Sequence, residues 1–403
     1  MIPDSRSDVA VPTGAGERHG LIDALRGFAL AGVLLVNLGA FTLYDYLDPA
    51  ARQALPTAGF DAVAGTLVRV LVENKSITLF SLLFGLGFSL QMERAAARGG
   101  DGLHLYLRRI AVLGLFGFAH CYLLWWGDIL LVYALMALVL VLFRKAADRV
   151  LLGCGLFVAL VLPPLLQPWI EAALAGQPGE EAMKAANLSA FASTSYLTAL
   201  RQNAAFANWA WTSYWGIYAF VAGRFLLGAW AGRRRLLQQP AVHRVLLQRL
   251  CLGGLLAGSA ITVLGEFLLP LGEHGPVATF CIRVLLRIGS PALAIGYAAG
   301  FALLYLHAGW RRWLDVFAPV GRMALSNYLV QTIVCTTVFY GFGLGVGPRH
   351  GYAGWLLAWA VLFAVQIALS HWWLARFRFG PAEWLWRSLA YARLQPMRRL
   401  VPV

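Results

Sequence analysis

The sequence predicts an all-α membrane protein, a polytopic bundle of about ten transmembrane helices with both termini in the cytoplasm. Of its 403 residues, 60% are hydrophobic and only 13% are charged, whereas about a quarter of the residues in soluble domains are charged. Several apolar runs approach the roughly 20 residues that cross a bilayer as a helix. No strand-like alternation is present, which favours helices over a barrel.

Ten apolar segments are predicted to span the membrane as one domain, residues 21–374. Residues 1–20 form a cytoplasmic tail, and residues 375–403 form an amphipathic, Arg-rich cytoplasmic tail suited to the membrane surface. The predicted spans are 21–43, 77–92, 109–126, 128–143, 150–173, 211–231, 249–271, 285–306, 318–341 and 352–374.

Two segments between the spans are predicted to lie outside the bilayer. The polar region 175–210 contains Gly-Gln-Pro-Gly and is expected to form a large loop with an amphipathic helix. Residues 59–75 are expected to form an interfacial helix before the second span.

The distribution of Lys and Arg sets the predicted orientation. Twenty-two of the 33 cations lie in the segments that an inside N-terminus would place in the cytoplasm. These segments are 1–20, 93–109, 144–149, 232–250, 308–314 and 375–403. The net charge of +14 therefore reflects membrane topology, and we do not assign it to nucleic-acid binding.

The first span carries three polar residues on one side. Asp23 and Arg26 are three residues apart and share a helix face, and Asn37 follows Arg26 by eleven residues, three turns further along. An ionisable residue inside a membrane is a functional hypothesis by default. The alternatives are a structural ion pair at the interface and an Asn that joins neighbouring helices.

Span nine, with the sequence GRMALSNYLVQ, is the second polar helix. Arg322, Ser326, Asn327 and Gln331 form a strip along it, which indicates either ligand binding or polar packing between helices. Lys75 begins the second span on the outer side, against the charge rule, so it is a candidate to hold an anionic group unless it is a boundary cation.

His120 and Asp128 form the third group. His120 is about 16 Å along the helix that rises from Arg109, so it lies deep in the apolar region, where a neutral imidazole could act as a base. A buried, fully bonded histidine is the alternative. Asp128, at the start of the next span, is expected to cap that helix or to orient His120. Arg108 and Arg109 lie where they could meet a phosphate-bearing donor.

The order and spacing of these residues resemble the YeiB family of membrane proteins over nearly the whole chain. The shared features are Asp23-x-x-Arg26-Gly27 with Asn37, LFSLLFGLGF at 79–88, His120 followed by WWGDILLVYA, GRMALSNYLVQ, and RFGPAEWLWR at 378–387. That family is grouped with transmembrane acyltransferases, which take an acyl group from cytosolic acyl-CoA. The relatives that modify surface sugars carry a histidine where this chain has Asn37.

The resemblance implies an acyl-CoA-dependent membrane acyltransferase of the bacterial inner membrane, with no permanently bound cofactor and no metal site. His120 would be the general base and Asp128 would orient it, while Asn37, Ser326 or Asn327 would donate hydrogen bonds to the oxyanion. The acceptor is an unknown lipid, sugar or small molecule. A transporter, or a lipid- or small-molecule-binding membrane protein without catalysis, is the alternative. The sequence leaves open whether the chain forms a homodimer.

Overall fold

The computed structural model describes residues 19–267 and 275–399, and within these ranges the regular secondary structure is helical apart from one isolated β-bridge between Phe377 and Arg398. The α-helices are α1 (Gly20–Phe41), α2 (Pro49–Gln53), α3 (Ala58–Leu71), α4 (Lys75–Ala97), α5 (Leu103–Leu123), α6 (Leu130–Leu142), α7 (Asp148–Leu156), α8 (Leu162–Ala173), α9 (Glu180–Phe191), α10 (Tyr196–Ser213), α11 (Gly216–Arg233), α12 (Arg244–Phe267), α13 (Pro276–Tyr305), α14 (Ala308–Leu314), α15 (Ala318–Arg322), α16 (Ala324–Phe339), α17 (Tyr352–Arg376) and α18 (Pro381–Ala390).

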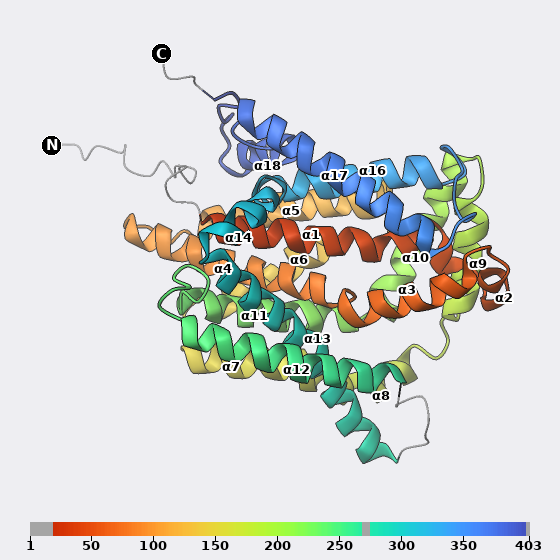
Figure 1. Cartoon of the computed structure of the whole chain (residues 1–403), viewed down its shortest axis with the longest axis horizontal. Coiled ribbons are helices and arrows are strands. Elements are labelled where there is room, and N and C mark those ends of the chain that lie inside the picture. The colour runs from red at the N-terminus through yellow and green to blue at the C-terminus, as the bar shows by residue number, and fades with distance from the viewer. Residues whose placement is uncertain (1–18, 268–274, 400–403) are drawn as a thin grey trace.

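The prediction of an all-α membrane bundle is confirmed. Each of the ten predicted segments overlaps a helix, and residues 268–271 of the predicted span 249–271 lie outside the described residues, as do residues 1–18 and 400–403 of the predicted tails. Five helical stretches are long and apolar enough to cross a membrane by length and composition: Gly20–Phe41, Asp148–Ala173, Arg244–Glu266, Pro276–Tyr305 and Tyr352–Arg376. The long helices run roughly along the horizontal axis of Figure 1, and α1 begins at the end of the bundle where α4 and α17 finish. We call this end, which the charge distribution predicts to be cytoplasmic, the inner end, and the opposite one the outer end.

Glycines bring several helix backbones into direct contact. An added Cβ on Gly85 of α4 would overlap the carbonyl oxygen of Phe225, and one on Gly228 of α11 would overlap that of Leu82. Gly258 of α12 is similarly pressed against α13. Because lipid is as apolar as a leucine side chain, helices in a membrane associate through such close packing.

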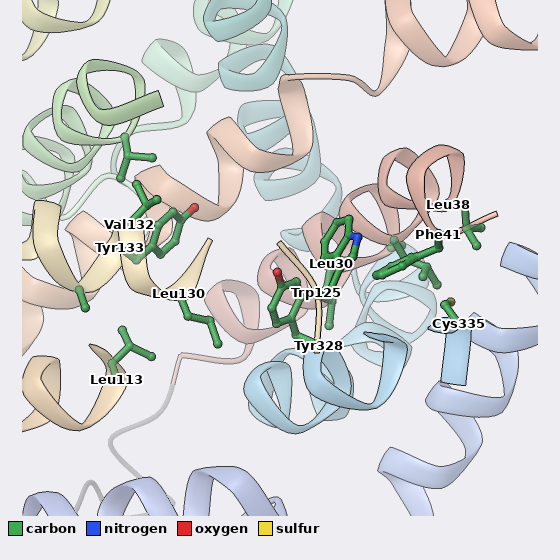
Figure 2. Close-up of a cluster of buried hydrophobic side chains, with 14 of the residues drawn as sticks. Leu30, Leu38, Phe41, Leu113, Trp125, Leu130, Val132, Tyr133, Tyr328 and Cys335 are labelled. Carbon is green, nitrogen blue, oxygen red and sulfur yellow. The ribbon is translucent and has the colours of Figure 1, made fainter. Parts of the chain in front are cut away.

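A large aromatic and aliphatic core joins α1, α5, α6 and α16 (Figure 2). The rings of Trp125 and Tyr328 lie in the middle of this cluster, with Phe41 on one side and Tyr133 on the other (Figure 2). Trp125 is 3% exposed although it lies in the turn between α5 and α6, so this turn is held inside the protein by its side chain.

The sequence predicts that residues 59–75 form a helix at the membrane surface, and this prediction is wrong for α3. This helix is followed by α4 along the same direction, so the two form one long path that is broken after Leu71 (Figure 1). An added Cβ on Gly32, halfway along α1, would overlap Ser76 Oγ, and Tyr297 of α13 donates a hydrogen bond to Leu71 O at 3.0 Å. The break is therefore level with the middle of the neighbouring helices.

Lys75 explains how the break is tolerated. Its side chain is buried, and its Nζ donates a hydrogen bond to Arg69 O at 2.8 Å, which satisfies a carbonyl at the end of α3. A cation at a helix C-terminus also interacts favourably with the helix dipole. Asn74 turns the chain in the left-handed region with φ of 62°, a conformation that Asn adopts more readily than most residues.

Two further regions differ from the expected outline. Most of residues 175–210 belong to helices, α9 and part of α10, at the outer end of the bundle, so this region is more ordered than a loop (Figure 1). The predicted span 318–341 is divided at Met323 into α15 and α16.

Replacement of Gly228 by alanine is expected to destabilise the protein by about 1–3 kcal/mol, because the added methyl group overlaps the α4 backbone. Gly153→Ala is the matched control: Gly153 is also helical, nothing lies within 4 Å of its added Cβ, and alanine is the better helix former. Thermal unfolding in detergent measures both. Equal melting temperatures for the two variants would contradict the close α4–α11 contact.

Candidate functional site

A cavity of about 1520 Å³ runs through the interior of the bundle. Its walls come from α1, α4, α5, α6, α10, α11, α15, α16 and α18, together with the α3–α4 break. Exposed residues at the inner end line it, among them Arg98, Asp101 and His104, so the cavity opens on the side predicted to be cytoplasmic.

The inner end of the cavity is strongly basic. The cationic side chains that line it are Arg26, Arg94, Arg98, Arg109, Arg322, Arg378 and Arg387. Three acidic residues, Asp23, Asp101 and Glu383, line the same part, and Asp23 pairs with Arg26 at 3.1 Å. The cations outnumber the carboxylates, so this mouth attracts anions.

Beyond the mouth, the cavity becomes apolar and then polar again. Leu30, Phe84 and Leu113 line its middle part. Polar groups reappear near the break and the outer end, where Asn37, Glu73, Asn74 and Asp128 line the wall beside the aromatic rings of Trp126, Trp211, Tyr214 and Tyr218.

His120 and Asp128 are in contact inside the bundle, as the sequence suggests. His120 Nδ1 lies 2.8 Å from Asp128 Oδ1, and neither side chain is accessible to solvent. Asp128 Oδ2 also accepts a hydrogen bond from Leu131 N at 2.7 Å. Asp128 therefore does both things that the sequence offered as alternatives: it caps the first turn of α6 and it orients His120.

The second ring nitrogen of His120 is also occupied. Its Nε2 lies 2.9 Å from Oγ1 of Thr332, which is fully buried on α16. Asp128, His120 and Thr332 thus form a hydrogen-bonded carboxylate–imidazole–hydroxyl series of the kind that activates hydroxyl groups in hydrolases. The sequence did not indicate Thr332, because one threonine in an apolar helix carries no signal.

His120 itself is not part of the cavity wall. Asp128 and Tyr328 line the cavity, and the Tyr328 ring packs on the imidazole with ring centres 5.0 Å apart. A ligand in the cavity therefore reaches His120 Nε2 only if the bond to Thr332 opens and the surrounding side chains move.

The polar residues of α16 are bonded within the protein and do not line the cavity. Asn327 Nδ2 donates to Ser370 Oγ at 3.0 Å, and Gln331 Nε2 donates to Gln366 Oε1 at 2.9 Å. Ser326 Oγ donates to the carboxylate of Glu383. This geometry agrees with the helix-packing alternative.

Glu383 is buried, whereas its spacing from Arg387 on α18 suggested a surface pair. Its carboxylate accepts hydrogen bonds from Leu325 N at 2.7 Å and Ser326 N at 3.1 Å, at the start of α16. The sequence signal that could have located it is the GPAE motif, which begins a helix with a proline beside an acidic residue. Burial raises the pKa of Glu383.

Six of the twelve site residues predicted from the sequence line the cavity: Asp23, Arg26, Asn37, Arg109, Asp128 and Arg322. The other six lie outside its wall: Lys75, Arg108, His120, Ser326, Asn327 and Gln331. Arg109 is held in place on α5 by a hydrogen bond to Gln91 Oε1 at 2.6 Å and by the ring of Trp386, 4.6 Å away. Arg108 instead donates to Leu389 O on α18 at 3.3 Å.

All five cysteines have free thiols. Among residues 19–267 and 275–399, no group of three or more His, Cys, Asp or Glu side chains is arranged to hold a metal ion.

Replacement of Asp128 by asparagine is expected to lower stability by about 1–3 kcal/mol, because a buried bond to His120 loses its charged acceptor. The matched control is Asp148→Asn, a partly exposed carboxylate paired with Arg234 at 2.9 Å, whose loss should cost less than about 1 kcal/mol. The melting temperatures of the two variants measure the two losses of stability. An Asp128→Asn protein as stable as Asp148→Asn would contradict a structural His120–Asp128 bond.

Three relatives match almost the full chain. "Uncharacterized protein YxaH" of Bacillus subtilis (strain 168) is 36% identical over 97% of this chain and 99% of its own length. "Uncharacterized protein YeiB" of Escherichia coli (strain K12) is 31% identical over 94% of this chain and 98% of its own length. The "Uncharacterized 39.9 kDa protein in amylase 3'region" of Bacillus acidopullulyticus is 31% identical over 96% and 97%.

The family model DUF418, described as a protein of unknown function, matches residues 231–393. This range includes α15, α16 and α18, which contribute Arg322, Tyr328 and Glu383 to the cavity. No solved structure matches the chain significantly. With end-to-end identity above 30% to YxaH and YeiB, the chain belongs to the YeiB-like family of membrane proteins that carries the DUF418 region.

Proposed function

We propose that this protein is an integral membrane acyltransferase of the bacterial inner membrane, which transfers an acyl group from cytosolic acyl-CoA to a hydroxyl or amine acceptor. One observation carries the proposal: the cavity passes from a basic mouth at the inner end, through an apolar middle, to polar side chains near the break and the outer end. Acyl-CoA has the matching order of groups, since its phosphates and its apolar acyl chain lie at opposite ends of the molecule.

The basic mouth supplies binding energy for the phosphates. Arg26 and Arg109 line it from two different helices, α1 and α5. One guanidinium group can donate two parallel hydrogen bonds to two oxygens of a phosphate. Arg109 is preorganised by Gln91 and Trp386, which reduces the entropy that binding costs. The thioester then lies beyond the mouth, in the low-dielectric part of the cavity, where polar groups interact strongly.

The sequence assigns the general base to His120, and this assignment stays a prediction. In its favour, the Asp128 carboxylate holds Nδ1, which leaves Nε2 as the basic nitrogen of a neutral ring. Against it, Nε2 is bonded to Thr332 and the ring is enclosed. Asn37 lines the cavity and is the better placed of the three proposed oxyanion donors, because Ser326 and Asn327 are bonded elsewhere.

A transporter or ligand-binding membrane protein is the second candidate function. The interrupted path from α3 to α4 favours it, since broken helices at the middle of the membrane form the binding sites of many transporters. Such a protein needs the same cavity and no base.

Acetyl-CoA and palmitoyl-CoA are expected to raise the melting temperature of the purified protein, because a ligand that binds only the folded state stabilises it by about 2.7 kcal/mol at one hundred times its dissociation constant. Arg26→Gln should reduce this shift at a fixed acyl-CoA concentration. Arg201→Gln, an exposed residue of α10 away from the cavity, is the matched control and should keep it.

Release of CoA separates the two candidate functions. A thermal shift together with CoA release in wild type supports acyl transfer, and a shift without CoA release supports the binding or transport function. If neither acyl-CoA shifts the melting temperature, acyl-CoA is not the ligand and the acyltransferase proposal fails.

A further inference from the structure

The break between α3 and α4 brings a carboxylate and two amide side chains to the cavity at the middle of the bundle. Glu73 and Asn74 form the break itself, and Asn37 comes from α1 beside it; all three line the cavity. Asn74 is exposed although it lies level with the middle of the neighbouring helices. Its exposure and its place in the cavity wall indicate that the break presents polar groups to the cavity.

Glu73 differs from the other carboxylates that line the cavity inside the bundle, whereas Asp101 is exposed at the mouth. Asp23 pairs with Arg26, Asp128 holds His120, and Glu383 accepts bonds from the start of α16. The Glu73 carboxylate has no hydrogen bond or ion pair with any residue in 19–267 or 275–399. An ionisable residue inside a membrane is costly, so one that no structural bond explains indicates function.

Two cations lie near Glu73, and neither bonds to its carboxylate. The charged groups that act on it electrostatically are Lys75, Arg69 and Glu266. Of the two cations, Lys75 directs its ammonium group to Arg69 O, where it holds the break closed. Arg69 bonds to Glu266 at 2.7 Å. Both cations are thus fixed nearby without covering the carboxylate, which stays free to accept a hydrogen bond from a ligand.

We propose that Glu73 is the catalytic residue that takes the proton from the acceptor, and that Asn37 and Asn74 hold the acceptor beside it. This inference rests on the acyltransferase function proposed above. It replaces His120, which lies behind Tyr328 and has both ring nitrogens bonded, with a group that is already in the cavity wall.

The chemical step is balanced without any further reactant. Glu73 removes the proton from the acceptor hydroxyl or amine as the oxygen or nitrogen attacks the thioester carbon. The new C–O or C–N bond forms, the C–S bond breaks, and the CoA thiolate leaves. The proton held by Glu73 then neutralises the thiolate, so free CoA is released and the carboxylate is regenerated.

The test compares Glu73→Gln with wild type in detergent, using acetyl-CoA as donor and ethanolamine, which carries both an amine and a hydroxyl group, as probe acceptor. We expect Glu73→Gln to keep the thermal shift with acetyl-CoA and the KM for acetyl-CoA, while kcat for CoA release falls by about 100-fold or more, the usual contribution of a general base. Glu73→Asp keeps a carboxylate on a shorter side chain and should recover part of the rate.

Glu181→Gln is the matched control. This carboxylate lies on α9 with 86% of its side chain exposed and pairs with Lys184, so its loss should leave the rate unchanged. Melting temperatures without ligand report whether Glu73→Gln folds; if it does not, Glu73→Ala takes its place, and a folded Ala variant with the full wild-type rate would overturn the inference.

The outcomes separate the two proposals. If Glu73→Gln releases CoA as fast as wild type while His120→Ala does not, the base is His120 and the Glu73 inference is wrong, although acyl transfer stands. If wild type itself neither shifts with acetyl-CoA nor releases CoA, the acyltransferase function fails, and the role of Glu73 as its base fails with it.

Discussion

Polar groups inside this bundle must find partners within the protein, because lipid offers none, and this requirement organises the structure. Buried polar residues of α16 reach partners on other elements: Thr332 contacts His120, Gln331 contacts Gln366 on α17, and Ser326 contacts Glu383 on α18. These bonds fix the position of α16 between α5 and the C-terminal helices. Glycine contacts such as Gly228 against α4 then allow the backbones to approach closely enough for the apolar core to close around them.

The same requirement explains why polar side chains without a hydrogen-bond partner among the described residues line the cavity. The side chains of Asn37, Glu73 and Asn74 line it, where water or a ligand can serve them. The Lys75 ammonium group donates a hydrogen bond to a carbonyl at the end of α3, and this lowers the free-energy cost of a helix break in the middle of the bundle. The break in turn places Glu73 and Asn74 in the cavity wall. The helix interruption, the buried lysine and the exposed asparagine are therefore consequences of one arrangement.

Much of the fold follows from the sequence, because long apolar runs have few alternatives to membrane helices. The site is harder to predict. Asp23, Arg26 and Asn37 share a helix face in the sequence and line the cavity together, since helical periodicity alone determines that. Lys75 and Glu73 lie in a segment that the sequence predicts to be an interfacial helix, and only packing against α1 and α13 places it inside the bundle. His120 and Asp128 are eight residues apart, on either side of the short connection between α5 and α6, and this closeness suggests their pairing. Thr332 is 212 residues from His120 in the sequence, so no local pattern indicates their contact.

The most direct test of this account is whether position 74 is accessible to water from the inner side of the membrane. In a variant with the five native cysteines replaced and Asn74→Cys introduced, a membrane-impermeant maleimide applied to inside-out vesicles should label the new thiol, because the cavity connects the break with the basic inner mouth. Cysteine at Gly153, which has nothing within 4 Å of its added Cβ and lies outside the cavity wall, should remain unlabelled. If Asn74→Cys is labelled no faster than Gly153→Cys from the inner side, the break does not face an aqueous cavity and the account is wrong.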